Sequence, residues 1–401
     1  MANQPAQSEL QQPSLASVFF AFFRLGITAF GGPAMITYIR KMAVSQKGWL
    51  DSAIFDDGVA LCQAIPGATA MQVAAYTGLR IRGTAGALAA YVGFGLPAFL
   101  LMMVLSTLYV STSELPLVKA LFLTLQAIIV AMIAYATVSF GRTSLKHWIH
   151  VLIAGIAAVL FFASVHPVVV IVLAALLGIT LLPAPDKKQE IPVTKLPRPE
   201  KFFLMLLFMV VVFFVLLYFL QPDLFALAAT MAWIDLFAFG GGFAALPLMF
   251  QEVVVVHSWL DSATFLNGLA LGQVTPGPIV ITATFVGFLS YGFWGGIIAT
   301  IAIFTPSFLF VVGTVPYYDR LRSSQLYQKI FQGILFSFVG LLLSVTLKLA
   351  LVVPWSWFHG LLAAGAFLFL LLGTEILWVV IFGVGIGVFM FVIVHSLPIS
   401  L

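Results

Sequence analysis

Long apolar runs separated by short polar stretches occupy almost the whole of this 401-residue chain. Each run is about 20 residues long, which is the length that an α-helix needs to cross the hydrocarbon core of a bilayer. The runs predict spans near residues 15–36, 57–76, 86–110, 117–140, 149–164, 166–182, 202–220, 223–248, 263–288, 293–315, 328–351, 357–372 and 374–395. We therefore expect an all-α, polytopic helical membrane protein with about 10–13 transmembrane segments.

Helix-breaking residues recur in the same order in the two halves of the chain. Gly31-Gly32-Pro33 and Pro66-Gly67 in the first half match Gly240-Gly241-Gly242 and Pro276-Gly277 in the second. The offset is 209 residues from Gly31 to Gly240 and 210 residues from Pro66 to Pro276. Glycine adopts positive φ and proline suits the first turn of a new helix, so each motif predicts one helix ending and another beginning within the membrane. Paired breaks of this kind are typical of the substrate site of a secondary transporter.

The polar stretches divide the chain into five parts. They are a disordered lead-in at 1–14, a first repeat at 15–182, a basic linker at 183–201, a connecting helix at 202–220 and a second repeat at 221–401. Because of the lone connecting helix, the second repeat starts from the opposite face of the membrane, so we expect the two repeats to be inverted relative to each other. An even number of membrane crossings before the second repeat would instead make the repeats parallel. The basic linker is expected in the cytoplasm. Arg40, Lys41 and Lys47 fit that orientation only if segment 15–36 is re-entrant or if they line a vestibule.

Composition restricts the class of protein further. The chain is 62% hydrophobic and 8% charged, whereas a soluble domain carries about 25% charged residues. The net charge of +4 is interpreted as lysine and arginine in cytoplasmic loops, with no nucleic-acid partner. The single Cys62 excludes an internal disulfide and a cysteine metal cluster. No nucleotide-binding loop and no metal-ligand spacing of histidines is present, so we expect no cofactor.

The breaks predict an anion site. A helix start leaves backbone N–H groups unpaired and carries a partial positive charge, which together bind oxyanions. Two inverted repeats could direct up to four such starts at one cavity near the membrane midplane. The alternative is that glycine and proline only permit kinks and close packing. Recurrence of both motifs at matched spacing favours the site.

Few ionisable residues fall inside the spans, so each is a functional candidate. Arg24 lies two helical turns before Gly31, where it could contact an anion or extend to the interface. Asp235 stands opposite Gly26 and not opposite Arg24; it either pairs with Arg24 or titrates during transport. Glu252, after the second glycine break, is a coupling candidate or a surface residue. Asp56, Asp57 and Asp261 flank segment starts and are expected to cap helices.

Gln63 and Gln273, each three residues before its proline, are neutral donors suited to an anion that must be released again. The predicted substrate-binding residues are Arg24, Gly31, Gly32, Pro33, Gln63, Pro66, Gly67, Gly240, Gly241, Gly242, Gln273, Thr275, Pro276 and Gly277. The predicted coupling residues are Asp235 and Glu252.

These motifs resemble a known family. Phe23-Arg24-Leu25-Gly26 leading into Ala29-Phe30-Gly31-Gly32-Pro33, Gln63-Ala64-Ile65-Pro66-Gly67, Phe239-Gly240-Gly241-Gly242 and Gln273-Val274-Thr275-Pro276-Gly277-Pro278 are similar to the motifs of the chromate ion transporter family, in its long two-domain form. The resemblance covers essentially the whole chain. It implies efflux of chromate across the bacterial inner membrane, chromate resistance, and sulfate as a competing anion. Asp235 departs from the uncharged or small residue expected there.

Other functions remain to be separated from chromate export. A sulfate or molybdate importer would use the same site chemistry and would differ only in the direction of flux. A membrane-embedded enzyme would need a nucleophile, a general base or a metal cluster, and the sequence offers no such constellation. The expected partners are chromate, sulfate, the lipid bilayer and a second copy of the chain in a homodimer.

Overall fold

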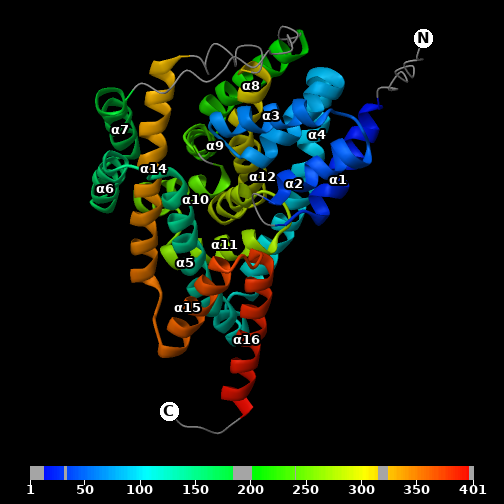
Figure 1. Cartoon of the computed structure of the whole chain (residues 1–401). Helices are drawn as coiled ribbons and strands as arrows, with labels where there is room; N and C mark the ends of the chain where they lie inside the picture. The colour runs from blue at the N-terminus through cyan, green and yellow to red at the C-terminus, as the bar shows by residue number, and fades with distance from the viewer. Residues whose placement is uncertain (1–12, 31–33, 184–200, 240, 315–323, 397–401) are drawn as a thin grey trace, which may run out of the picture.

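The computed structural model describes residues 13–30, 34–183, 201–239, 241–314 and 324–396, and in these ranges the regular elements are helices, without a strand (Figure 1). The elements of the first repeat are α1 (Leu15–Thr28), α2 (Ala34–Arg40), the π-helix η1 (Lys41–Gln46), α3 (Ser52–Ala64), α4 (Thr69–Thr112), α5 (Pro116–Ser144), α6 (Trp148–Phe162) and α7 (Pro167–Leu181). The connecting helix is α8 (Lys201–Leu220). The elements of the second repeat are α9 (Pro222–Leu236), α10 (Gly242–Phe250), the π-helix η2 (Gln251–Val256), α11 (Ser262–Val274), the 3₁₀-helix η3 (Ile279–Ile281), α12 (Thr282–Thr314), α14 (Gln325–Val352), α15 (Trp357–Leu371) and α16 (Ile376–Ser396).

The two repeats contain equivalent elements in the same order, down to local backbone angles. The long helix of the first repeat is kinked at Gly83 (φ 64°, ψ −157°), and that of the second at Gly292 (φ 66°, ψ −157°). A π-helix follows the second short helix in both repeats. The prediction of two homologous halves is therefore confirmed.

The repeats run in opposite directions. Thr137 of α5 faces Thr346 of α14, and a Cβ atom at Gly141, farther along α5, would lie 3.8 Å from Val339, earlier on α14. These two equivalent helices are thus antiparallel.

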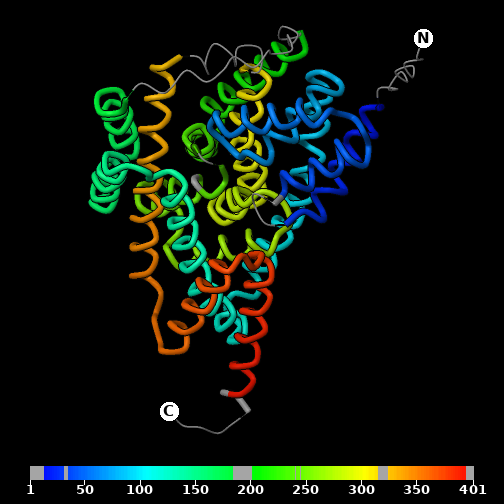
Figure 2. Tube along the Cα trace, viewed as in Figure 1, coloured from blue at the N-terminus to red at the C-terminus, as the bar shows by residue number. Residues whose placement is uncertain are grey.

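Each repeat completes the packing of the other. The α6–α7 hairpin of the first repeat packs on α14 of the second, and α15 and α16 of the second pack on α5 of the first. Figure 2 shows the green α6 and α7 beside the orange α14. The earlier helices of the two repeats pack together as well: α1 packs on α4, α9 packs on α12, and α4 packs on α12. Neither repeat is therefore an independent domain.

The breaks fall where the glycine and proline motifs predict them. The apolar run 15–36 is divided between α1 and α2, and the run 57–76 between α3 and α4. Six helices in the described part of the chain are long and apolar enough to span a membrane, and five shorter apolar helices accompany them. The lead-in 1–14 and the linker 183–201 lie almost entirely outside the described residues. Figure 1 places α1, α2 and α3 together in the upper half of the molecule, and a re-entrant course for segment 15–36 stays a prediction.

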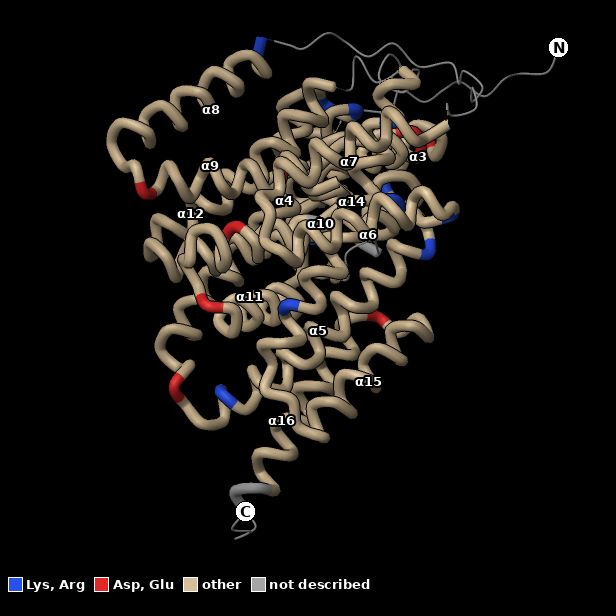
Figure 3. Tube along the Cα trace, turned by 90° about the vertical axis from the view of Figure 1, so that its left-hand side faces the viewer, with Lys and Arg blue, Asp and Glu red and all other residues tan. Residues whose placement is uncertain are grey.

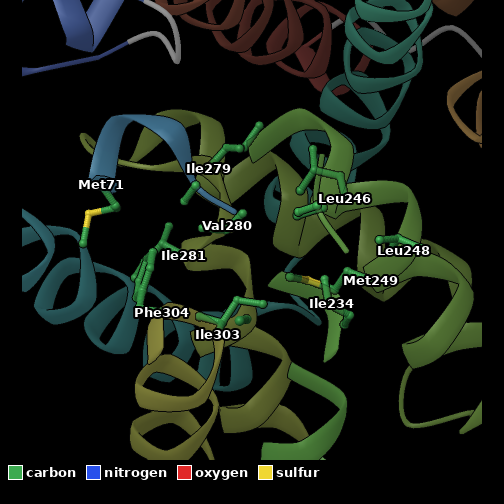
Figure 4. Close-up of a cluster of buried hydrophobic side chains, with 14 of the residues drawn as sticks. Met71, Ile234, Leu246, Leu248, Met249, Ile279, Val280, Ile281, Ile303 and Phe304 are labelled. Carbon is green, nitrogen blue, oxygen red and sulfur yellow. The ribbon is translucent and has the colours of Figure 1, made fainter. Parts of the chain in front are cut away.

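Apolar side chains from both repeats surround the breaks. Figure 4 shows Met71 of α4 close to Ile281 of η3, with Ile303 and Phe304 of α12 beside them. All four side chains are at least nine-tenths buried. Aliphatic packing of this kind fixes the positions of the helix ends that it encloses.

Candidate functional site

The four interruptions meet in two pairs, and each pair joins one repeat to the other. The backbone N–H of Gly67, in the second break of the first repeat, donates to the carbonyl oxygen of Ala238, in the first break of the second repeat, at 3.0 Å. The N–H of Gly277 donates to the carbonyl oxygen of Ala29 at 2.9 Å. Ala29 and Ala238 are equivalent residues, as are Gly67 and Gly277, so the two hydrogen bonds are related by the pseudo-twofold axis.

The two donor glycines need their lack of a side chain. Gly67 has φ +118° and Gly277 has φ +106°, angles that other residues rarely adopt. A Cβ atom at Gly67 would collide with the Ser307 hydroxyl, and one at Gly277 would approach the Ala98 Cβ to 2.8 Å. Ser307 and Ala98 are themselves equivalent, since each follows the proline of its long helix.

New helices begin beside these bonds. Pro66, Gly67, Pro276 and Gly277 are all buried, and α4 starts at Thr69 while η3 starts at Ile279. Gly241, with φ +94°, lies against the Thr69 side chain, and a Cβ atom at Gly242 would come within 2.8 Å of the Ile279 side chain. Gly31, Gly32, Pro33 and Gly240 were also predicted as site residues and lie outside the described residues. Convergence of all four starts on a single anion therefore stays a prediction.

Asp235 lies in this region and is completely buried. One of its carboxylate oxygens accepts a hydrogen bond from the Ser307 backbone N–H at 2.7 Å, and the other accepts one from the Ser307 hydroxyl at 2.8 Å. The same hydroxyl accepts a hydrogen bond from the N–H of Ala68, at the start of α4, at 2.9 Å. Asp235 of the second repeat is thus linked through Ser307 to a helix start of the first.

Arg24 does not pair with Asp235. Arg24 is exposed on α1, and among the described residues no ion pair joins it to the buried Asp235. Gly26, at the position equivalent to Asp235, packs where a Cβ atom would collide with the backbone carbonyl of Phe94. The pairing alternative is therefore wrong, because the Asp235 carboxylate is turned into the protein, where Ser307 holds it.

The other predicted site residues divide into buried and exposed ones. Thr275 is buried, and its hydroxyl donates to the carbonyl oxygen of Leu271 at 2.8 Å. Gln273 is half-buried, but Gln63 is exposed, so the two matched glutamines lie in different surroundings.

The expectation that Asp56 and Asp57 cap a helix is wrong. Both lie inside α3, and Asp56 forms an ion pair with Arg40 at 3.2 Å. The cap prediction holds for Asp261, whose carboxylate accepts from the N–H groups of Ala263 and Thr264, each at 2.9 Å.

A second polar cluster surrounds Glu252, which is buried rather than on the surface. One carboxylate oxygen lies 4.0 Å from His257 Nε2, and the other has no hydrogen-bond partner in the described residues. Beside it, the Lys348 ammonium donates to the Phe161 carbonyl oxygen at 2.9 Å, the Ser164 hydroxyl at 3.1 Å and the Gln251 side chain at 3.4 Å. The π-helix η2 presents Gln251 and Glu252 to this cluster.

A cavity of about 220 Å³ lies between the repeats. Phe30, at the first glycine break, and Phe243, after the second, both line it. Its polar lining comes from Tyr135 and Ser139 of α5 and from Thr374 and Glu375 in the turn before α16. The cavity therefore adjoins both glycine breaks.

Comparison with known proteins agrees with this arrangement of repeats. The family model described as chromate transporter matches residues 16–179 and again residues 225–388. The chain belongs to the chromate transporter family. The two matched regions coincide with the two repeats and leave out the linker and α8.

Relatives from this family match most of the chain. It is 43% identical over 348 residues to an uncharacterized transporter of Methanocaldococcus jannaschii, covering 86% of each chain. It is 30% identical over 359 residues to a chromate transport protein of Pseudomonas aeruginosa, covering 84% of this chain and 81% of the relative. A chromate transport protein of Cupriavidus metallidurans is 28% identical over 349 residues, with 84% and 83% covered. No solved structure matches the chain.

Sequence reasoning missed several residues of these clusters. Lys348 carried a usable signal, because it is a charged residue inside an apolar run of this transporter. Gln72 carried a similar signal, because it is a polar residue inside the apolar run 57–76. In the structure it is fully buried, its side-chain amide donates to the Pro66 carbonyl oxygen, and its own amide oxygen has no partner in the described residues. Ser307 carried no such signal, since serine is frequent in membrane helices.

Proposed function

We propose that this protein is a secondary transporter that exports chromate from the cytoplasm across the inner membrane of a bacterial cell and thereby confers chromate resistance. Family membership supports transport, and the names of two relatives support chromate as the substrate. The observation that carries the proposal is the pair of cross-repeat hydrogen bonds, Gly67 to Ala238 and Gly277 to Ala29. They hold the helix breaks of one repeat against those of the other.

In the proposed mechanism, a tetrahedral dianion is bound by first-turn backbone N–H groups of the broken helices other than those of Gly67, Ala68 and Gly277, which already donate to protein oxygens. These groups are fixed before the anion arrives, so binding requires little reorganisation. Gln273 is neutral and donates its side-chain amide to the anion, and Thr275 contributes its hydroxyl once this has turned away from the Leu271 carbonyl oxygen. Arg24 is exposed, so its proposed role is to attract the anion toward the site from the surface.

The membrane potential favours export. Moving one elementary charge across 100 mV is worth about 2.3 kcal/mol, so a dianion that leaves an inside-negative cell gains about 4.6 kcal/mol. That energy corresponds to a concentration ratio on the order of a thousandfold. Uptake would need coupling to a cation or a proton. Export is therefore the direction that requires the fewest titrating groups.

The proposed orientation follows from the distribution of charge. Figure 3 shows most lysine and arginine residues in the upper half of the molecule. Under the positive-inside rule that end faces the cytoplasm, and the C-terminal end of α16 faces the opposite side.

Asp235 and Glu252 are the proposed coupling residues. Both are buried carboxyl groups in a protein that spans the membrane, where ionisable residues usually mark ion or proton pathways. Asp235→Asn removes the titrating group and keeps its shape. If Asp235 takes up a proton during transport, the variant loses the pH dependence of chromate flux; an unchanged pH profile would exclude it.

Flux of radiolabelled chromate in everted membrane vesicles tests the function. Energised everted vesicles are positive inside, so they should accumulate chromate, and excess sulfate should compete. Arg24→Ala should weaken uptake from low chromate concentrations, while Arg24→Lys, which keeps the charge, should weaken it less. Accumulation that does not respond to the membrane potential would contradict export driven by that potential.

The second candidate is transport of sulfate or another oxyanion in the inward direction. The site chemistry supports it equally, because these ions are also tetrahedral dianions. Vesicle orientation separates the two functions, since an importer moves labelled sulfate preferentially into right-side-out vesicles and an exporter moves labelled chromate into everted ones. The proposed homodimer is tested by cross-linking in the native membrane.

A further inference from the structure

The turns between α6 and α7 and between α15 and α16 are equivalent in backbone but opposite in chemistry. Ser164 in the first turn has φ +59°, and Gly373, at the equivalent place in the second, has φ +88°. The residue before α7 is His166, and the residue before α16 is Glu375. One turn therefore presents an imidazole where the other presents a carboxylate.

The helices that face these turns also differ in side-chain charge and size at equivalent positions. Lys348 of α14 extends its ammonium group to the Phe161 carbonyl oxygen and the Ser164 hydroxyl of the α6–α7 turn. Its equivalent on α5 is Ser139, which lines the cavity at the α15–α16 turn. A lysine side chain fills the space at one turn, and a short serine leaves about 220 Å³ at the other.

The cavity lies on a route to the helix breaks. Phe30 and Phe243 line it from the two glycine breaks, and Glu375 lines it while being exposed. A carboxylate in a membrane protein is stable where water reaches it. The cavity extends from the exposed Glu375 to Phe30 and Phe243 beside the glycine breaks.

We propose that this cavity is a vestibule through which the transported oxyanion passes to or from the helix breaks, and that Glu375 lowers the apparent affinity for the anion from that side. The inference rests on the proposed function. Fixed charges do not drive net transport, which depends on the gradients and on coupling. They do set the concentration of anion near each opening, and hence the half-saturating concentration measured from each side.

The equivalent turn of the first repeat has no carboxylate in this place. Lys348 and His166 lie at the positions equivalent to Ser139 and Glu375, and Glu252, in the same cluster, carries the opposite charge to Lys348. A single carboxylate acting on a dianion across partly hydrated space changes its local concentration by about three- to tenfold. The two sides are therefore expected to differ in half-saturation by about that ratio.

The first test measures access without any transport. In a Cys62→Ala background, which has no other cysteine, Ser139→Cys is treated with water-soluble methanethiosulfonates of either charge. The cationic reagent should react about three- to tenfold faster than the anionic one, relative to the same pair at Glu114→Cys in the exposed α4–α5 turn. Adding Glu375→Gln should abolish that preference, and molybdate should slow both reactions. An unreactive Ser139→Cys, or a preference that survives Glu375→Gln, would overturn the vestibule.

The second test measures flux from each side. Glu375→Gln should lower the half-saturating chromate concentration about three- to tenfold in one vesicle orientation and leave it unchanged in the other. Glu114→Gln, which removes an exposed carboxylate far from the cavity, should change neither. Equal changes from both sides, or no change, would overturn the role of Glu375. Normal flux with an unreactive Ser139→Cys would reject the vestibule and keep the proposed function; a reactive Ser139→Cys in a protein that moves no oxyanion would reject the proposed function alone.

Discussion

Thr137 and Thr346, which occupy the same position in the two repeats, place their hydroxyl oxygens 3.1 Å apart where α5 meets α14. A residue that touches its own equivalent lies on the axis that relates the two copies. The pseudo-twofold axis of the molecule therefore passes between these two side chains. Because α5 and α14 are antiparallel there, the axis runs across the helices and not along them.

This contact predicts a specific cross-link. In the Cys62→Ala background, Thr137→Cys combined with Thr346→Cys should form an intramolecular disulfide on mild oxidation, because the two side chains already touch. After a protease cut introduced in the linker 183–201, the disulfide would hold the two fragments together on a gel, and a reducing agent would separate them. Pairing Thr137→Cys with a cysteine at Gln325, at the far end of α14, provides the control that should not cross-link. Equal cross-linking of both pairs would contradict the contact between Thr137 and Thr346.

Gly67→Ala should abolish transport and reduce the yield of folded protein. The new Cβ atom would meet the Ser307 hydroxyl at a residue whose φ of +118° already disfavours a side chain. The matched control is Gly155→Ala on α6, where a Cβ atom meets nothing within 4 Å. Thermal stability in detergent and vesicle flux measure both effects. If the two variants behave alike, the break does not need glycine.

Ser307→Ala should cost about 1–3 kcal/mol in the free energy of unfolding, because it leaves a buried carboxylate oxygen of Asp235 without its hydroxyl donor. The Ala68 N–H loses its acceptor in the same variant. Ser290→Ala, on the same helix, removes a hydroxyl that bonds only to its own helix at 2.8 Å and should change little. Ser307→Thr keeps the hydroxyl and should restore part of the stability. A Ser307→Ala protein as stable as Ser290→Ala would contradict the link.

Asp261→Ala should destabilise the start of α11 by about 1 kcal/mol, because it removes an N-cap. Partial burial raises the pKa of Asp261, but hydrogen bonds from Thr264 and Ala263 outweigh it and leave the pKa below its usual range. A lowered pKa in the folded state means that the cap stabilises the protein at neutral pH and loses that effect as the pH falls below about 4. Stability curves of the native protein and Asp261→Ala should therefore converge in acid. Curves that stay parallel would refute an ionised cap.

Local sequence predicted the interruptions well, because glycine and proline act on their own backbone. The breaks near Gly67 and Gly277 and the start of α11 at Asp261 all follow from residues within a few positions. The partner of Asp235 did not follow, since Ser307 is 72 residues away and only the packing of α9 on α12 brings them together. The predicted pairing of Arg24 with Asp235 was wrong for a related reason. The local sequence places Arg24 on one face of α1, but which face of α1 is buried depends on α4, which packs against Gly26.

The lengths and phases of the apolar runs also do not indicate that helices of one repeat pack on helices of the other. Nothing near Lys348 indicates that it contacts a turn 184 residues earlier. The two π-helices were likewise invisible, because the extra residue per turn is a response to surrounding packing.

The two hydrogen bonds between the breaks have a consequence for assembly. Gly67 donates to Ala238 and Gly277 donates to Ala29, so each repeat holds one donor and one acceptor that only the other can satisfy. If the chain were cut in the linker, the two repeats would still have to associate in antiparallel orientation before the interior of either was fully packed. During synthesis, these two hydrogen bonds therefore cannot form until the second repeat has been inserted into the bilayer.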